Sequence, residues 1–545
     1  MKTVNTISSY LINKLYSHKI RHIFGVPGDY ALGFYKELEN SQLEVINTCD
    51  EQGAGFAADA YARINGLGAV CVTYCVGGLK LANTTAQAFA EKSPVVVISG
   101  APGINERIKN PLLHHKVRDF DTQLKVFEQL TVAATVLDNP STACSEIDRV
   151  FNAALRYKRP VYIELPRDMI SVPVHSGQLF HDEIPSSDAK ALQEALHEAV
   201  DIINSAKKPV IIAGVELQRF GLQELLLGLL EESTIPVAST ILSKSVIMEN
   251  HPQYLGVYEG AMGREDVIDY VETSDCLILL GVFMSDINLG IFTAHIDQGK
   301  SIYVTSEKLS IHHHTYEGVE MEDFIKGLVE ANIRYRKDKD IPHPPTPKPT
   351  EPISGTRITV QYLFQRLNSF LDDNTVVIAD PGDAMFAALD MTVHCESEFL
   401  SPAYYTSMGF AVPASLGVQL AKPELRPLVL VGDGAFQMTG MELASIARFN
   451  LNPIIIVLNN QGYGTERPML DGCFNDIHLW NYSRIPEVLG AGKGYDIWTE
   501  DQLEDALQEV GEHTESFKIL DVHLDPQDRS QALQRLTNAL GKRVK

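Results

Sequence analysis

The chain has 545 residues and a net charge of −24, from 46 Lys and Arg against 70 Asp and Glu. Hydrophobic residues make up 45% and charged residues 21%, which is typical of a globular protein and excludes disordered, collagen-like and disulfide-scaffold classes. The acidic balance argues against binding to a nucleic-acid backbone or to an anionic membrane surface. We therefore expect neither nucleic acid nor a membrane as a partner.

The cysteines and the first residues indicate the compartment. The seven cysteines are scattered and contain no CxxC pair, which fits a reducing environment. The first twenty residues lack the apolar core of a signal peptide and predict an amphipathic helix. No apolar run approaches the ~18 residues that a membrane span needs. We expect a cytoplasmic protein.

Short β-branched segments alternate with helical patterns along the whole chain. The clearest of these segments are 69–74, 94–100, 209–214, 276–281, 427–432 and 453–458. A strand–helix–strand order at this spacing predicts parallel βαβ units joined by right-handed crossovers. The predicted fold class is α/β, with a doubly wound parallel sheet in each of several domains.

Two stretches interrupt this pattern. Residues 337–355 are rich in Pro and charge and predict an interdomain linker, and a weaker break falls at 175–190. The predicted domains are 1–175, 190–337 and 356–545, the last of which includes a helix near the C-terminus. Because ligands of open α/β sheets bind beyond the carboxyl ends of the strands, chemistry is expected in the loops that follow strands.

The most informative of these loops follows the predicted strand that ends at Val431. A GDG turn contains Asp433 and Gly434, and the next strand ends at an NNxG segment that contains Asn460 and Gly462. Adjacent parallel strands end at one edge, so a carboxylate, an amide oxygen and a carbonyl meet there, and these are ligands that suit Mg²⁺. The glycines let backbone N–H groups approach a diphosphate. Taken alone, the GDG segment would be interpreted as a tight turn. The NNxG segment that follows favours a metal and diphosphate site instead.

GDG followed by NNxG at this spacing resembles the thiamine-diphosphate-binding motif. The resemblance covers essentially the whole chain as a pyrimidine-binding, a middle and a diphosphate-binding domain. It implies thiamine diphosphate with Mg²⁺ held by Asp433, the Asn460 side chain and the Gly462 carbonyl. It also implies a homodimer at least, because the cofactor lies between the first domain of one subunit and the third of its partner. A homotetramer is common among such enzymes.

Glu51 follows a strand-like segment and begins a helix that is rich in small residues. A carboxyl suits a helix N-terminus, so taken alone the residue is a cap. The resemblance implies that Glu51 contacts the aminopyrimidine ring of the cofactor. There it supports removal of the C2 proton, and the resulting ylid attacks a carbonyl carbon and accepts electrons during decarboxylation.

Asp29 is presented after a predicted strand, and His114 and His115 stand together in a predicted loop. Adjacent histidines on a loop are usually just solvated, and the three at 312–314 are interpreted as part of a surface loop. The GDY and HH elements together resemble the 2-oxo-acid decarboxylases of the pyruvate and indolepyruvate type. Acetolactate synthases share the cofactor motifs but lack the HH element, so this element discriminates between them.

Glu466 lies four residues beyond Gly462, as in the decarboxylase pattern. The resemblance implies that Asp29, His115 and Glu466 form a proton-transfer set, which protonates the intermediate after CO₂ leaves and helps to release the aldehyde. The alternative for Glu466 is a surface residue paired with Arg467.

Further positions are implied to bind the cofactor. Met408 aligns with the bulky residue that bends thiamine diphosphate, although a Met is more often plain core packing. The Thr406 carbonyl would accept a hydrogen bond from the amino group of the cofactor. The remaining implied positions are Thr73, Asp383, Gly434, Ala435, Tyr463, Gly464 and Thr465. Ala435 and Asp383, with Pro381, stand where hydroxyl residues are usual.

The resemblance is greatest to bacterial phenylpyruvate and indolepyruvate decarboxylases. It implies the decarboxylation of a 2-oxo acid, phenylpyruvate or indole-3-pyruvate first, to an aldehyde and CO₂. Met385 and Thr465 align with pocket walls, and the small Thr465 predicts a deep pocket. An acetolactate-synthase-like carboligase is the alternative, which bound FAD would favour. A non-catalytic thiamine-diphosphate-binding regulator is disfavoured by the intact Glu51, HH and Glu466 set.

Overall fold

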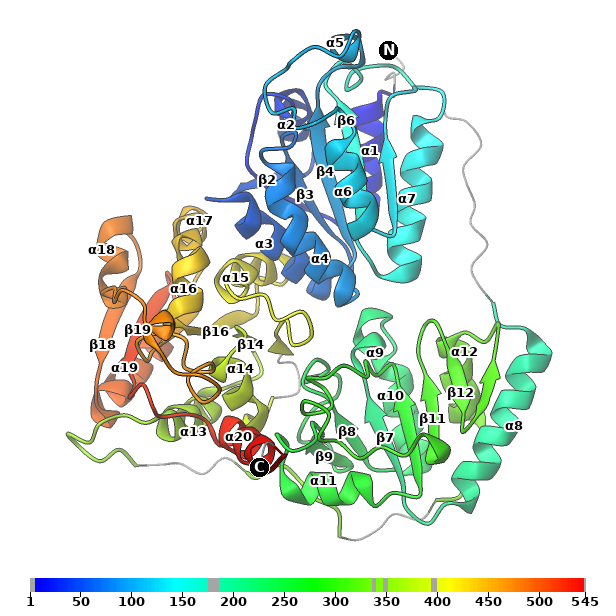
Figure 1. Ribbon diagram of the computed structural model, residues 1–545, viewed down its shortest axis with the longest axis vertical. Coiled ribbons are helices and arrows are strands. Elements are labelled where there is room, and N and C mark those ends of the chain that lie inside the picture. The colour runs from blue at the N-terminus through cyan, green and yellow to red at the C-terminus, as the bar shows by residue number, and fades with distance from the viewer. Residues whose placement is uncertain (1–4, 175–185, 336–339, 347–350, 394–398, 544–545) are drawn as a thin grey trace.

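The structure is a computed structural model that shows three α/β units (Figure 1). It describes residues 5–174, 186–335, 340–346, 351–393 and 399–543. Much of the predicted break at 175–190 and parts of the predicted linker at 337–355 therefore lie outside the described residues. Each unit contains one sheet, and the domain boundaries proposed from the sequence stay predictions. Among the described residues, no helix combines the length and the apolar character that crossing a membrane requires.

The N-terminal sheet has six parallel strands in the order β2-β1-β3-β4-β6-β5. The strands are β1 (His22–Gly25), β2 (Glu44–Asn47), β3 (Gly68–Val72), β4 (Val95–Ala101), β5 (Ala133–Val136) and β6 (Val161–Pro166). The helices are α1 (Ile7–Ser17), α2 (Leu32–Glu39), α3 (Glu51–Asn65), η1 (Gly78–Leu81), α4 (Ala82–Ala90), α5 (Ile104–Arg107), α6 (Thr122–Leu130) and α7 (Ala143–Tyr157). Alternate residues of β3 and β4 belong to two different cores, so helices cover both faces of the sheet.

The middle sheet has seven strands in the order β13-β12-β11-β10-β7-β8-β9. They are β7 (Pro209–Ala213), β8 (Val237–Ser239), β9 (Tyr254–Val257), β10 (Cys276–Leu280), β11 (Ser301–Val304), β12 (Leu309–Ile311) and β13 (His314–Tyr316). The helices are α8 (Ala189–Ser205), α9 (Val215–Arg219), α10 (Gln223–Ser233), α11 (Glu265–Glu272), η2 (Gln298–Lys300) and α12 (Met321–Glu330).

An all-parallel sheet is the wrong prediction for this middle unit. The strands β12 and β13 are antiparallel to their neighbours because the segments that join them are too short for a crossover helix. The three histidines at 312–314 lie at the surface, as expected, and His312 and His313 form the turn of this hairpin. His314 begins β13, and its Nδ1 lies 3.0 Å from the carboxylate of Glu198.

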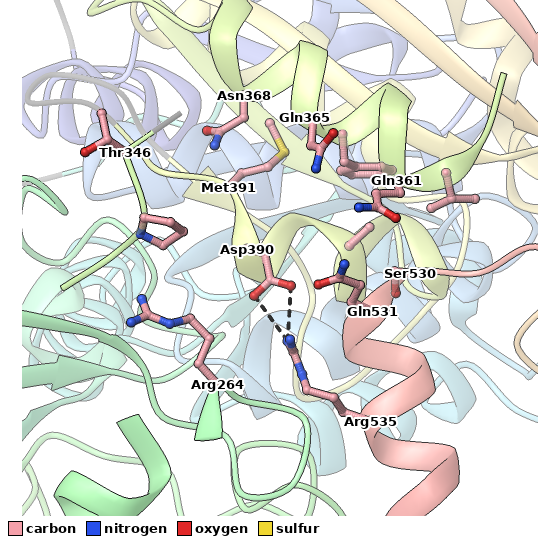
Figure 2. Close-up of a pocket in the computed structure, with 14 residues that line it drawn as sticks. Arg264, Thr346, Gln361, Gln365, Asn368, Asp390, Met391, Ser530, Gln531 and Arg535 are labelled. Carbon is pink, nitrogen blue, oxygen red and sulfur yellow. Dashed lines mark hydrogen bonds and ion pairs between the residues drawn. The ribbon is translucent and has the colours of Figure 1, made fainter. Parts of the chain in front are cut away.

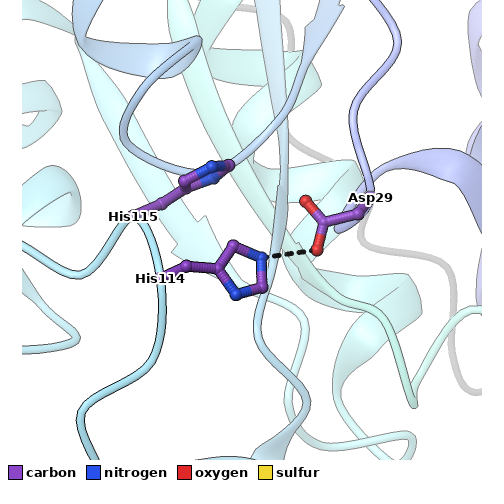
Figure 3. A group of neighbouring side chains, drawn as sticks. All are labelled: Asp29, His114 and His115. Carbon is purple, nitrogen blue, oxygen red and sulfur yellow. Dashed lines mark hydrogen bonds and ion pairs between the residues drawn. The ribbon is translucent and has the colours of Figure 1, made fainter.

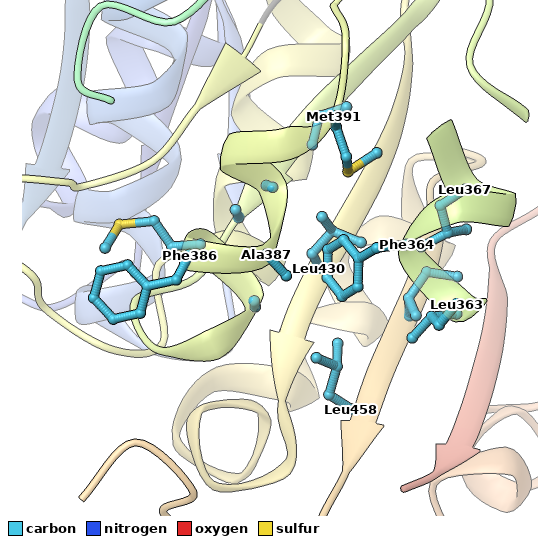
Figure 4. Close-up of a cluster of buried hydrophobic side chains, with 14 of the residues drawn as sticks. Leu363, Phe364, Leu367, Phe386, Ala387, Met391, Leu430 and Leu458 are labelled. Atoms are coloured by element: carbon cyan, nitrogen blue, oxygen red, sulfur yellow. The ribbon is translucent and has the colours of Figure 1, made fainter. Parts of the chain in front are cut away.

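The C-terminal sheet has six parallel strands in the order β15-β14-β16-β17-β19-β18. They are β14 (Thr375–Ala379), β15 (Phe399–Leu400), β16 (Arg426–Gly432), β17 (Ile454–Asn459), β18 (Lys493–Ile497) and β19 (Lys518–His523). The helices are α13 (Val360–Phe370), α14 (Asp383–Ala387), η3 (Ala388–Asp390), α15 (Ala411–Ala421), α16 (Asp433–Thr439), η4 (Gly440–Glu442), α17 (Leu443–Arg448), η5 (Cys473–Asn475), η6 (Tyr482–Arg484), α18 (Ile485–Leu489), α19 (Glu500–Glu512) and α20 (Gln531–Arg543). Figure 4 shows Phe364, Leu430 and Leu458 in the core between this sheet and helices α13 and α14.

The N-terminal and C-terminal units meet through α3 and α15 (Figure 1). A Cβ on Gly417 would lie 2.0 Å from the carbonyl oxygen of Ala57, so glycine permits this close approach of the two helices. At the start of α3, the backbone N–H groups of Cys49 and Asp50 each donate to Glu442 at 3.0 Å. The packing therefore places the N-terminus of α3 beside η4, which directly follows α16.

Candidate active site

Asp433 lies where β16 passes into α16. The register pairs Gly432 with Leu458, which confirms that β16 and β17 end side by side. Asp433 is fully buried, and its carboxylate oxygens accept hydrogen bonds from the N–H of Gly434 at 2.7 Å and from the N–H of Gly462 at 3.1 Å. Burial raises the pKa of this carboxyl to about 7. A nearby cation would reverse that effect, so the position suits a metal ion.

Asn460 and Gly462 follow the end of β17. The side-chain Oδ1 of Asn460 is buried and has no hydrogen-bond partner among the described residues. Gly462 has a φ of +136°, and a Cβ there would lie 2.0 Å from the carbonyl oxygen of Asn475, so glycine is required. A buried oxygen without a partner, two residues from the Gly462–Asp433 hydrogen bond, fits a hard cation such as Mg²⁺. The three-ligand set stays a prediction.

The loop after β17 folds back over the start of α16. A Cβ on Gly434 would lie 2.7 Å from the ring of Tyr463, so the ring covers bare backbone. The hydroxyl of Thr465 would lie 3.3 Å from a Cβ on Gly382, which brings the same loop to the start of α14. This arrangement gathers five of the residues implied to bind the cofactor, namely Gly434, Ala435, Tyr463, Gly464 and Thr465.

The turn before α15 carries Thr406 and Met408. Thr406 has a φ of +57°, and Met408 is partly buried against the core shared by the N-terminal and C-terminal units. Buried Asp380 accepts hydrogen bonds from the N–H groups of Gly409 and Ala411 at 2.9 and 2.8 Å. These two bonds fix the backbone that directly follows Met408.

The Asp383 side chain is hydrogen-bonded to another segment of the same chain. Its carboxylate accepts hydrogen bonds from the backbone N–H of Ser530 at 2.8 Å and from the Ser530 hydroxyl, and burial raises its pKa. This contact ties the start of α14 to the segment just before α20. Met385 is fully buried in the C-terminal core. The cofactor role of Asp383 and the pocket-wall role of Met385 stay predictions.

Glu51 is the first residue of α3. The helix cap is Asp50, whose carboxylate accepts the N–H of Gln52 at 2.8 Å, so the interpretation of Glu51 as a cap is wrong. The Glu51 side chain is 13% exposed, and its Oε1 would lie 3.1 Å from a Cβ on Gly77. The Thr73 hydroxyl is buried and has no hydrogen-bond partner among the described residues. The Thr73 side chain packs against Gly28, so of this residue only the backbone borders the Gly77 position beside Glu51.

Asp29, His114 and His115 lie together in the N-terminal unit (Figure 3). His114 Nε2 is 2.7 Å from Asp29 Oδ2, and the His114 ring stacks on Tyr30 with ring centroids 4.9 Å apart. The His115 ring packs edge-on against His114, and its Nδ1 is buried without a partner among the described residues. The sequence analysis joined Asp29 to His115, whereas the structure pairs it with His114.

Glu466 lies in the C-terminal unit and is exposed. Arg467 forms ion pairs with Asp471 at 2.9 Å and with Asp476 at 2.7 Å, so the alternative that Glu466 is the partner of Arg467 is wrong. Figure 1 shows α5, which precedes the histidine loop, at the end of the N-terminal unit farthest from the C-terminal unit. Among the described residues, the cluster of Asp29, His114 and His115 does not include Glu466.

Two contributors were missed by the sequence analysis. Arg167 lies 3.9 Å from the Asp29 carboxylate, forms an ion pair with Glu106 and stands over the Tyr30 ring at 4.9 Å. Asp380 orders the turn that carries Met408. Both directly follow strands of the structure, Arg167 after β6 and Asp380 after β14, and neither strand is among the segments predicted above. The apolar runs before these residues were the available signal.

A well-formed cavity of about 430 Å³ lies elsewhere, between the middle unit and helices α13 and α20 (Figure 2). Arg535 lines this cavity and forms an ion pair with Asp390 at 3.1 Å. The glutamines that line the cavity are exposed, namely Gln361, Gln365 and Gln531. The residues implied to bind the cofactor do not line this cavity. Instead, they lie in two groups, one on the N-terminal unit and one on the C-terminal unit.

Comparisons with known proteins match three parts of the chain to domains of one enzyme family. Residues 5–123 match the thiamine pyrophosphate enzyme N-terminal TPP binding domain, residues 196–331 the central domain and residues 380–522 the C-terminal TPP binding domain. The chain is 34% identical to an indole-3-pyruvate decarboxylase of Azospirillum brasilense, over 97% of each protein. It is 31% identical to a probable pyruvate decarboxylase of Schizosaccharomyces pombe, over 97% of this chain and 94% of that one. It is also 31% identical to an alpha-keto-acid decarboxylase of Mycobacterium leprae, over 98% and 96%.

The chain belongs to the family of thiamine-diphosphate-dependent 2-oxo-acid decarboxylases. It is therefore a carboxy-lyase with two thiamine-diphosphate-binding domains. The family, the α/β fold class and the reaction class predicted from the sequence are confirmed. That the residues around Glu51 and around Asp433 form two halves of one cofactor site stays a prediction.

Proposed function

We propose that this decarboxylase acts on a 2-oxo acid with an aromatic or long aliphatic side chain, phenylpyruvate or indole-3-pyruvate first, and releases an aldehyde and CO₂. Thiamine diphosphate, when bound, supplies the electron-accepting ring for this reaction. The buried, partnerless oxygens of Thr73 and Asn460 support its binding. Asp433, the Asn460 side chain and the Gly462 carbonyl would hold Mg²⁺ against its diphosphate.

The acid–base residues divide between the two halves of the site. Glu51 holds a proton against the aminopyrimidine ring. The Asp29–His114 pair and the adjacent His115 hold a proton for the carbon that CO₂ leaves, and Glu466 reaches the same carbon from the diphosphate side. Each group is worth roughly 10²–10⁴ in rate when it is correctly placed.

The active form would be a homodimer at least, with a tetramer as the common arrangement in the family. Exposed apolar side chains lie on both units, several of them in the same loops as the residues implied to act. On the C-terminal unit these are Met438, Met441, Met469, Leu470, Phe474 and Leu479, and on the N-terminal unit Leu32, Val76, Ile108, Leu112 and Val117. We assign them to the surface that a second copy covers. A second copy that covers it would bring Asp29 and His114 of one subunit to Glu466 of the other.

Substrate choice is expected to favour a bulky side chain. Thr465 is small, and each additional buried methylene is worth about 0.8 kcal/mol, so a deep pocket discriminates against a lone methyl group. We expect kcat/KM for phenylpyruvate and indole-3-pyruvate to exceed that for pyruvate. The measurement is a coupled aldehyde assay across these acids with Mg²⁺ and thiamine diphosphate added. A ratio that favours pyruvate would overturn the aromatic assignment, and a flavin spectrum with acetolactate as product would favour the carboligase.

Glu466→Gln is expected to keep cofactor binding, because Glu466 is neither a proposed metal ligand nor the partner of the aminopyrimidine ring. Turnover should fall by ~10²–10⁴, the range for one acid–base group. The measurements are steady-state kcat and the stoichiometry of bound thiamine diphosphate. Arg467→Gln, which removes the neighbouring ion pairs to Asp471 and Asp476, is the control for loop disturbance. Full activity in Glu466→Gln would make this residue a surface carboxylate.

A further inference from the structure

Lys80 forms a salt bridge with the carboxylate to which the proposed function assigns cofactor binding. Its Nζ lies 2.7 Å from Glu51 Oε2 and also contacts the carboxylate of Asp50. The Lys80 side chain is 47% exposed, whereas that of Glu51 is 13% exposed. Partial burial opposes the charge of Lys80, but its hydrogen bonds to Asp50 and Glu51 outweigh this and raise its pKa. Lys80 is therefore a cation at neutral pH.

The geometry leaves one oxygen of Glu51 for a ligand. Oε2 is taken by Lys80, and Oε1 points to the turn after β3, 3.1 Å from where a Cβ on Gly77 would lie. The Thr73 backbone borders the same Gly77 position, at 3.2 and 3.3 Å. The second oxygen is therefore aimed at the turn between Thr73 and Gly77, where the strand β3 has just ended.

We propose that Lys80 is a positioning residue for Glu51: it holds one carboxylate oxygen, directs the other at the cofactor, and sets the pH range in which cofactor binding takes up a proton. This proposal rests on the proposed contact between Glu51 and the aminopyrimidine ring. A hydrogen bond between a carboxylate and a ring nitrogen needs one proton, which comes from solvent when Glu51 is ionised. An ammonium 2.7 Å away disfavours that added positive charge. Lys80 therefore moves proton uptake to lower pH.

Few other charged groups face this carboxylate. Asp50 shares the ammonium, and Glu442 accepts the N–H groups of Cys49 and Asp50 at the start of the helix. Tyr35, from α2, is held neutral because burial, followed by the nearby Cys71 and Glu51, raises its pKa well above the ordinary value. Among the described residues that face Glu51, Lys80 is thus the cation that sets the local charge.

The test counts protons by titration calorimetry of the full-length protein with thiamine diphosphate and Mg²⁺, in buffers of different ionisation enthalpy across a pH series. Lys80→Met should move the pH midpoint of proton uptake upward by about 0.5 to 1 unit, the range for a partly exposed ion pair. Lys80→Arg should keep the native midpoint. Asp50→Asn preserves an N-cap side chain but removes a negative charge, so the midpoint should move downward. Lys36→Met, which removes the surface Lys36–Glu39 pair of the same unit, is the matched control and should change nothing.

Two further measurements separate the possible failures. In a Glu51→Gln background, Lys80→Met should no longer shift the midpoint, because the carboxylate that Lys80 acts on is gone. An unchanged midpoint in Lys80→Met overturns the proposal, as does an equal loss of affinity in Lys80→Met and Lys80→Arg without any shift, which would make the contact merely structural. If the native protein binds no thiamine diphosphate, the proposed function itself fails. Apo-protein melting temperatures show whether each variant folds.

Discussion

Glu51→Gln is expected to slow exchange of the C2 hydrogen of bound thiamine diphosphate by ~10²–10⁴, the range for removal of one acid–base group. The substitution keeps the shape of the side chain but removes its charge and its ability to hold a proton against the aminopyrimidine ring. The fold should survive, because Asp50 rather than Glu51 caps α3. Quenched-flow NMR of the cofactor bound to the purified protein measures the exchange rate directly.

The neighbouring position provides the control for this experiment. Asp50→Asn changes the adjacent carboxylate, keeps a side chain that can cap the helix, and leaves Glu51 in place. Exchange in Asp50→Asn should therefore stay within about tenfold of the native rate. Native exchange in Glu51→Gln would contradict the assignment, and equal slowing in both variants would show that the helix start, rather than the Glu51 carboxyl, is responsible.

The fold could be predicted where parallel strands are buried on both faces. Such strands are continuous apolar runs, as in β4, where every residue is buried. The hairpin strands β12 and β13 have three residues each and are only partly buried, so they carry no such run. Their antiparallel pairing follows from the lengths of the turns, which the periodicity of the sequence does not encode.

The proximity of Asp433 to the NNxG segment could be predicted because topology fixes the edge at which adjacent parallel strands end. The hydrogen bond between Asp433 and the N–H of Gly462 joins residues from two successive strand ends, as the motif spacing implies. The partner of Asp29 could not be predicted in the same way. His114 and His115 are chemically identical, and the choice depends on the loop backbone, in which His115 has a φ of +66°.

The contact between Lys80 and Glu51 could not be predicted from the sequence. Lys80 lies in the short helix η1, 29 residues from Glu51, and a single lysine in such a segment resembles any solvated surface residue. Its meaning depends on the turn between Thr73 and Gly77, which brings η1 back to the start of α3. Sequence patterns identify residues that chemistry requires, whereas the groups that orient those residues are found only from the packing.

Asp433→Ala is expected to abolish the retention of thiamine diphosphate that depends on Mg²⁺. Asp433 is the charged side chain in the proposed ligand set, and a divalent cation loses most of its attraction to the site without it. The substitution also removes the acceptor that links the backbone of Gly434 to that of Gly462, so the two strand ends lose their shared contact. Gel filtration at low free Mg²⁺, followed by an assay of bound cofactor, measures retention.

Two further variants separate charge from geometry at this position. Asp433→Asn keeps an acceptor oxygen but loses the negative charge, so it should lose Mg²⁺-dependent retention while its melting temperature stays closer to native than that of Asp433→Ala. Asp521→Asn changes another buried carboxylate of the same sheet, which accepts a hydrogen bond from Asn459 and is not a proposed ligand. It should retain the cofactor. Burial disfavours the ionised form of the Asp433 carboxyl, and a bound cation would offset that cost. Stoichiometric cofactor in Asp433→Ala at micromolar free Mg²⁺ would show that the cation is held elsewhere.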